Sequence, residues 1–381
     1  MAYSFPYIVL MAFFAICAFL YENYENNEKR HNLTIVVITV FFVFYAFRGY
    51  LYSDWAGYAY NLKYAEWSDI INWDITDKKA HEPGFVILCL LCKYILNEYS
   101  FLVFVCMTID MLLFLRFMKR RDIGNYAFVF ALFTAFEGLG IMFNLLRNSI
   151  SIFIFLNALE YIEKREPLKY FGMCMLCLCF HFSSVFFFPL YFFLHRRLNR
   201  NVMITVCIGS FLFYISNVSI VTSIVGVLNL GGVFEQKAED YTEMLTTSKS
   251  FGITKVIEKL GLAALVFIYY DDILKKKGRQ IVVNCFTLYI FFYYVTAEFR
   301  DLSDRLSVLF CFSLWVLWMD VIKSIELRNN RILLVGVLSL YVTYMTISDV
   351  KLPIQEYDNI LFGAKSQQER LKILNRTFEA E

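Results

Sequence analysis

Long apolar runs fill this sequence, and we select seven of the charged or ionisable side chains that stand within them or at their ends. A charge in or beside a bilayer is costly, so each of these residues is a candidate for function. The acidic residues and the histidine could hold or remove a proton, and the arginines could bind an anion through their forked donors. The acid–base candidates are Asp54, Glu82 and His181, and the anion-binding candidates are Arg48, Arg147, Arg300 and Arg305.

Arg147 lies about one and a half turns into its apolar run. An arginine at that depth must face a polar cavity or a partner, because snorkelling reaches only so far. Function and a structural ion pair are the two alternatives. His181 lies between two short apolar segments, ahead of Ser183 and Ser184. It is either a hydrogen-bonded core residue or a base, since histidine is suited to proton transfer near neutral pH.

The other candidates each have an ordinary explanation beside the functional one. Arg48 and Asp54 follow a span, and they could simply pair at the headgroup level. Glu82 precedes Pro83, an ordinary helix-entry signal, and an acidic residue suits a helix N-terminus. Arg300 and Arg305 flank two aspartates, so they either pair with these or bind an anion such as pyrophosphate.

Composition identifies the elements that must position these residues. Of 381 residues, 59% are hydrophobic and only 18% are charged, which is too little polar surface for a soluble protein of this length. The net charge of +2 gives no global field that would attract nucleic acid. The first apolar stretch, residues 5–21, lacks the basic region and cleavage site of a signal peptide, so we expect it to remain as a span.

The apolar runs predict an all-α, polytopic transmembrane helix bundle with about twelve spans. The expected spans cover residues 5–21, 32–47, 100–118, 125–137, 141–161, 169–180, 182–194, 201–218, 251–270, 280–297, 306–322 and 331–348. Three of these are short for a span. With no linker or internal repeat, residues 1–350 are expected to form a single transmembrane domain, followed by a C-terminal tail at 351–381.

Basic residues mark alternate connections and predict the orientation of the spans. The clusters begin at Lys29, Lys119, Lys164, Arg196, Lys275 and Lys323, and all six can lie inside, as the positive-inside rule requires. The connections 48–82, 219–250 and 298–305 then lie outside, together with both termini.

Residues 84–97 decide whether this orientation holds. The run is apolar but only fourteen residues long, shorter than a bilayer demands, which favours a re-entrant or interfacial helix. If it spans instead, the 48–82 loop becomes cytoplasmic.

The ten cysteines lie mostly inside apolar runs, as Cys89, Cys92, Cys174 and Cys177 do. Cys-x-x-Cys pairs can bind zinc or carry out redox chemistry, but here they lack the loop context and the partnering histidines of such sites. We interpret them as small buried apolar residues and predict neither a metal nor a cofactor.

Several short motifs follow one another along the chain: FRGYLYSDWAGYAY, HEPGFVILCLL, FNLLRNSISIFIFL, CFHFSSVFFFPLYFF, Arg305-Leu306 and Pro353 with Tyr357. In this order they resemble the motifs of the EpsG family of Wzy-like polysaccharide polymerases. Each motif is weakly specific, whereas the ordered set, spread over residues 1–362, is much stronger. The spacing from Arg48 to Asp54 and the Arg147-Asn148 pair depart slightly from the family pattern, and neither departure removes a charge.

The resemblance implies a metal-independent glycosyltransferase in the bacterial inner (cytoplasmic) membrane. Such a polymerase joins undecaprenyl-diphosphate-linked oligosaccharide repeats at the outer face, producing exopolysaccharide, capsule or O-antigen chains. Its partners would be the lipid-linked glycan, membrane lipids and, as an open question, a chain-length regulator. Positive charge would stabilise the departing diphosphate, and a base would act near the acceptor hydroxyl.

The candidate residues fit these two jobs. Arg147 and Arg305 are the first choices for the diphosphate, with Arg48 and Arg300 as further candidates, while Asp54, Glu82 and His181 compete as base or acceptor-binding group. The 219–250 loop either covers the glycan or is a plain loop. The competing functions are a membrane acyltransferase acting on surface glycans and a transporter or flippase of lipid-linked sugars. The latter predicts a two-fold internal symmetry that the sequence lacks.

Overall fold

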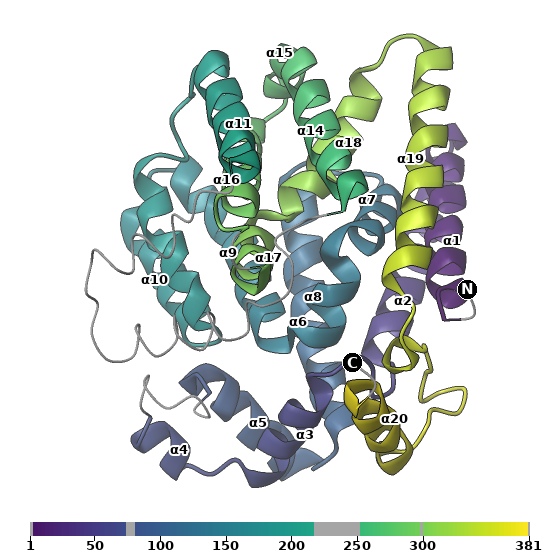
Figure 1. Ribbon diagram of the computed structural model, residues 1–381, viewed down its shortest axis with the longest axis vertical. Helices are drawn as coiled ribbons and strands as arrows, with labels where there is room; N and C mark the ends of the chain where they lie inside the picture. Colours follow the sequence, from purple (N-terminus) through teal and green to yellow (C-terminus); the bar gives the residue numbers. More distant parts are fainter. Residues whose placement is uncertain (1–2, 74–80, 217–251, 298–299, 380–381) are drawn as a thin grey trace. The chain divides into compact units, whose positions relative to one another are not determined.

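The computed structural model describes residues 3–73, 81–216, 252–297 and 300–379, without the side chains of residues 300 and 301. Within these residues every regular element is a helix, and one isolated antiparallel bridge joins Arg48 to Asn359 (Figure 1). The predicted all-α class is therefore confirmed. The chain divides into two compact units, one formed by Met1–Tyr191 with Leu327–Glu381 and the other by Phe192–Glu326.

The first unit is built from long apolar helices around a central buried one. That helix is α9 (Leu146–Glu163), which packs against α6 (Tyr99–Arg120) and α10 (Pro167–Leu178). The surrounding helices are α1 (Phe5–Asn23), α2 (Asn27–Ala46), α7 (Tyr126–Phe133), η1 (Thr134–Gly138), α8 (Leu139–Asn144) and α19 (Arg328–Asp349). Because α9 is buried on nearly every face, a polar group on it has to find its partner inside the protein.

Aromatic side chains hold these helices together. Phe41 of α2 stacks on Phe130 of α7 with their ring centroids 4.0 Å apart. Phe114 of α6 lies 5.7 Å from Phe130 and 5.0 Å from Phe153 of α9. Such rings bury large apolar areas, so the phenylalanine-rich composition supplies the packing between four helices.

A layer of short helices lies below the long ones in Figure 1 and contains the segment that the sequence left ambiguous. It consists of α3 (Trp55–Tyr64), α4 (Ser68–Ile71) and α5 (Pro83–Ile95). Helix α5 has 13 residues and packs on α3 and α4. Because a span needs roughly 20 residues, α5 has the length of a re-entrant or interfacial helix.

The C-terminal segment is folded onto the first unit. After α19, the chain forms η5 (Pro353–Gln355) and α20 (Gln367–Glu379). Tyr7 at the start of α1 donates a hydrogen bond to the Gln355 carbonyl at 2.7 Å.

The second unit is centred on α16 (Arg279–Val295), which packs against α11 (Arg200–Ile215) and α18 (Phe312–Ser324). Its other elements are α14 (Ile253–Ile268), α15 (Tyr270–Leu274), α17 (Arg300–Ser307) and η4 (Val308–Phe310). A buried ion pair joins Arg279 Nε to Asp320 Oδ2 at 2.5 Å, and Lys276 Nζ reaches Asp320 Oδ1 at 2.8 Å. The carboxylate on α18 thereby neutralises the start of α16.

The expected count of about twelve spans is not confirmed. Among the described residues, five helices are long and apolar enough to cross a membrane, or six if a pair bent by 52° is one span. They are Phe5–Asn23, Asn27–Ala46, Tyr99–Arg120, Tyr126–Asn144 and Arg328–Asp349, with Leu302–Phe310 and Phe312–Ser324 as the bent pair.

Two expected spans have different local structures from those predicted. The run 125–137 continues through η1 and α8 to Asn144, so the next helix begins at Leu146 rather than near residue 141. Residues 182–194 were expected to form an α-helix, but Phe182–Phe192 forms a 3₁₀-helix, η2, with Pro189 inside it. Proline lacks the N–H that an α-helix interior needs. The expected 219–250 loop lies outside the described residues.

Candidate functional site

Glu82 stands at the entry of α5, where that helix meets the end of α10. Pro83 occupies the first helical turn, and the amide of Gly84 donates to the Cys179 carbonyl at 2.8 Å. A β-carbon at residue 84 would lie 2.7 Å from the Cys179 carbonyl oxygen. Only glycine lets the two helix ends approach this closely, so the local sequence fixes where the Glu82 carboxylate lies.

The Glu82 carboxylate joins three elements that are distant in the sequence. Its Oε1 accepts from the Phe182 amide at 2.8 Å and lies 3.3 Å from Nδ1 of His181. Its Oε2 forms an ion pair with Nη1 of Arg147, near the start of α9. The structure therefore brings three of the seven predicted residues, Glu82, Arg147 and His181, to one place.

The surroundings of Glu82 keep it ionised. Burial alone would raise the pKa of its carboxyl, but the hydrogen bond with His181 and the charge of Arg147 outweigh burial and lower this pKa to about 2. A carboxylate with so low a pKa is a weak proton acceptor at neutral pH. Glu82 is therefore better suited to orienting His181 and Arg147 than to serving as the base.

Arg147 has the polar partner that its depth in an apolar run demands. Besides Glu82, its guanidinium lies over the Phe85 ring, 5.9 Å from the centroid, and interacts with the Tyr58 hydroxyl. Its Nε has no hydrogen-bond partner among the described residues, and its side chain remains 23% exposed. The ion pair thus leaves one buried donor of Arg147, Nε, without a partner, while part of the side chain remains exposed.

His81 adds a second imidazole next to this group. It forms a close contact with the Asn61 amide and lies edge-on to the Phe85 ring at 5.9 Å. Burial first, and then the charge of Arg147, lower the pKa of His81 to about 4. It is therefore neutral at physiological pH. The sequence analysis did not select His81, although its position directly before Glu82 was a signal.

Arg48 lies in the protein interior, 1% exposed. Its Nη1 donates to the Tyr45 carbonyl at 2.8 Å, and its guanidinium lies over the Phe143 ring at 5.3 Å. Nη2 of Arg48 has no hydrogen-bond partner among the described residues. Arg48 is therefore buried in this structure, and its expected role in binding the diphosphate stays a prediction.

Asp110 is an interior acid that the sequence analysis missed. It lies in the middle of α6, 1% exposed, and its Oδ2 accepts from Ser149 Oγ at 2.7 Å. Arg48 is close enough to interact with it electrostatically. A single aspartate inside the apolar run YSFLVFVCMTIDMLLFLRF was a signal of the same kind as Arg147.

Asp54 is exposed at the start of α3, apart from the Glu82 group but linked to it. The Asn144 side-chain oxygen accepts from the amides of Ser53 and Asp54, at 3.2 and 3.4 Å. Tyr58 donates to the Asn144 carbonyl at 2.9 Å. The loop that carries Asp54 therefore connects to Arg147 through Tyr58.

The two late arginines belong to the second unit. Arg305 is exposed on α17, and the side chain of Arg300 lies outside the described residues. Glu82, Arg147 and His181 belong to the first unit, and the expected roles of Arg300 and Arg305 stay predictions. Within the part of the chain that the structure describes, no cluster of three or more His, Cys, Asp or Glu residues could hold a metal ion.

Comparison with known proteins identifies one family. A family model described as the EpsG family matches residues 31–361, most of the chain. That range contains Glu82, Arg147 and His181 together with Arg48 and Asp54. No curated protein and no solved structure matches the chain.

Proposed function

Because this chain belongs to the EpsG family, we propose that it is a polysaccharide polymerase acting on lipid-diphosphate-linked oligosaccharide repeats. The family indicates a membrane protein of polymerase-like kind, and five long apolar helices agree with a membrane location. The finer proposal names undecaprenyl diphosphate as the lipid carrier and the outer face of the bacterial inner membrane as the place of reaction.

The observation that carries the proposal is the single carboxylate that holds both an imidazole and a guanidinium. With Nδ1–H of His181 donating to Glu82, its Nε2 bears a lone pair and serves as the base. Arg147, ion-paired to the same carboxylate and 23% exposed, binds the diphosphate through guanidinium donors that Glu82 does not hold.

In the proposed glycosyl transfer, His181 and Arg147 account for the proton and for the leaving group. Nε2 of His181 takes the proton of the acceptor sugar hydroxyl, and that oxygen forms a bond to the anomeric carbon of the growing chain. The bond from that carbon to the diphosphate oxygen breaks, and the electron pair leaves with the lipid diphosphate. Arg147 stabilises the charge that develops there, and the proton passes from His181 to water.

The remaining candidates take supporting roles in the proposal. Asp54, exposed beside α3, binds the acceptor sugar. Arg300 and Arg305 are further ligands of the diphosphate. Arg48 contributes a buried charge next to the Asp54 loop and does not contact the substrate directly.

The test is the size distribution of lipid-linked glycans in cells that lack the gene. We expect single repeats to accumulate and long chains to disappear. Arg147→Ala should reproduce this deletion, because losing charge stabilisation of a leaving group costs about 100-fold or more in rate. The matched control is Arg116→Ala, at a half-exposed arginine of α6, which should keep normal chains.

Two results would contradict this proposal. Normal chain length in Arg147→Ala cells would remove that residue from the site. Long chains that lack acetyl groups in the deletion strain would indicate an acyltransferase instead.

A further inference from the structure

A C-terminal strap, residues 353–370, lies along the loop that follows α2. Three backbone hydrogen bonds attach it, from Gly49 to the Asp358 carbonyl at 3.1 Å, from Ile360 to Phe47 at 2.8 Å and from Tyr52 to Ile354 at 2.9 Å. The family model ends at residue 361, so the last part of the strap is not covered by it. Both ends of the loop 47–52 are thus held by one segment about 300 residues away in sequence.

Side chains fit the strap closely to this loop. The Tyr357 ring stacks on Phe44 with centroids 4.1 Å apart, and its hydroxyl donates to the Phe44 carbonyl at 2.9 Å. A β-carbon at Gly49 would overlap the Asp358 carboxylate. The strap therefore has one register on the loop, and Asp358 marks it.

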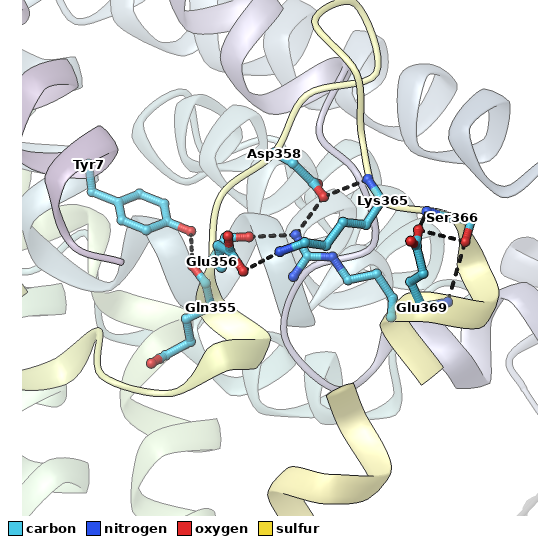
Figure 2. A network of polar contacts seen from close by, with 8 residues as sticks. Tyr7, Gln355, Glu356, Asp358, Lys365, Ser366 and Glu369 are labelled. Carbon is cyan, nitrogen blue, oxygen red and sulfur yellow. Dashed lines mark hydrogen bonds and ion pairs between the residues drawn. The ribbon is translucent and has the colours of Figure 1, made fainter. Parts of the chain in front are cut away.

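Arg370 fixes Asp358 in that register. Its side chain is 1% exposed, and Nη2 alone donates both to the Glu356 carbonyl and to Asp358 Oδ2, each at 2.6 Å. Figure 2 shows Glu356 and Asp358 close together, each joined by dashed lines to its polar partners, with Lys365 beside them. A buried ion pair is costly and contributes little net stability, so its best-supported use is to specify one arrangement.

The loop 47–54 also contacts residues that lead to Arg147. Directly after Tyr52, the amides of Ser53 and Asp54 donate to the Asn144 side chain. Tyr58 joins Asn144 to Arg147. A continuous series of contacts therefore runs from Arg370 to Arg147 without leaving the first unit.

We infer that Arg370 is a positioning residue, which acts through Asp358 and the loop 47–54 to set the Arg147 group for turnover. The inference rests on the proposed polymerase function for its activity readout. Its structural part, that the loop depends on Arg370, can be tested separately.

The experiment compares Arg370→Met with Arg370→Lys in the purified full-length protein. Lysine can bring one ammonium to the place of Nη2, which makes both contacts, whereas methionine fills similar space without charge. The control is Arg376→Met, an exposed arginine of the same helix. Turnover is measured on lipid-linked repeats extracted from the deletion strain, and hydrogen exchange is followed in the peptide that covers residues 47–54.

We expect the turnover of Arg370→Met to fall about tenfold or more. Misplaced reacting groups need to raise the activation free energy by only about 1.4 kcal/mol to have that effect. Amides of Gly49 and Tyr52 should exchange faster, because their acceptors lie on the strap. Arg370→Lys and Arg376→Met should stay near wild type in both measurements.

Wild-type exchange at residues 47–54 in Arg370→Met would overturn the inference, as would unchanged turnover. If hydrogen exchange rises throughout the Arg370→Met protein, that variant is misfolded and Gly49→Ala is tested in its place. The added carbon displaces the Asp358 carboxylate while Arg370 stays present. Gly49→Ala should then show the same loss of turnover and the same faster exchange at residues 47–54, without faster exchange elsewhere in the protein. If the exchange pattern holds but wild-type protein extends no repeats, the polymerase proposal fails and the loop's dependence on Arg370 stands.

Discussion

At the scale of single residues, the arrangement assigns different tasks to two groups that the sequence could not separate. Glu82 and His181 were equal candidates for the base. The carboxylate accepts from Arg147, His181 and the Phe182 amide, which keeps it ionised and occupied. The imidazole is held through Nδ1, and in the neutral tautomer that donates to Glu82 its other nitrogen is a proton acceptor. We therefore propose proton transfer as the role of His181 and orientation as the role of Glu82.

The lowered pKa values of Glu82 and His81 predict a loss of stability in acid. The pKa of Glu82 falls from 4.5 to about 2 and that of His81 from 6.5 to about 4. As the pH is lowered, the unfolded chain therefore binds each proton at a higher pH than the folded protein does. The contribution of His81 is full above pH 6.5 and is lost as pH falls toward 4. That of Glu82 is full above pH 4.5 and is lost toward pH 2. Each shift corresponds to at most about 3 kcal/mol.

Thermal unfolding of the purified protein between pH 7 and 4 measures this effect. His81→Gln should flatten the decline of Tm between pH 6.5 and 4, because glutamine does not titrate. His31→Gln, at an exposed position of α2, should leave the slope as it is. If Tm declines with pH as steeply in His81→Gln as in the wild type, protonation of His81 is not the cause of the decline.

At the scale of elements, the contact between the start of α5 and the end of α10 places Glu82 against His181. Gly84→Ala puts a carbon 2.7 Å from the Cys179 carbonyl oxygen, so the two helix ends must separate. We expect this change to reduce chain elongation by about tenfold or more, as small misplacements of reacting groups do. The readout is the ratio of long to single lipid-linked repeats.

Gly172→Ala provides the matched control for that prediction. Gly172 lies inside α10, and a β-carbon there meets nothing within 4 Å. Alanine also favours helix by about 1 kcal/mol over glycine, so this variant should elongate chains normally. Equal behaviour of the two variants would mean that the α5–α10 contact does not set the site.

At the scale of the whole molecule, the orientation of the helices in the membrane remains a prediction from the basic clusters. Ile71 of α4 is 83% exposed, in the connection expected outside, and Lys275 is 75% exposed in a cluster expected inside. Nine of the ten native cysteines are buried, so their reaction with a thiol reagent should be slow. Introduced cysteines can therefore report the side of the membrane.

A membrane-impermeant maleimide should label Ile71→Cys in intact cells. It should label Lys275→Cys only after the cells are permeabilised. Labelling of Lys275→Cys in intact cells, with Ile71→Cys protected, would invert the orientation. Protection of both would place the 48–82 connection inside and make α5 a span.

The sequence by itself determined the helical class, the family resemblance and the charges worth explaining. These follow from composition, local order and the cost of charge near lipid, which need no long-range contacts. It did not determine the number of long spans, because proline in Phe182–Phe192 and the break near Asn144 interrupt apolar runs whose hydropathy is continuous.

Only the tertiary structure decided which charges meet. Arg147 and His181 lie 65 and 99 residues from Glu82, whose carboxylate joins them, and no local pattern records such a pairing. It also buried Arg48, whose motif suggested an accessible charge, and placed Arg370 against Asp358, whose carbonyl accepts from Gly49. The physical reason is that partners of buried charges are chosen by packing across the fold, where desolvation makes each unpaired group costly.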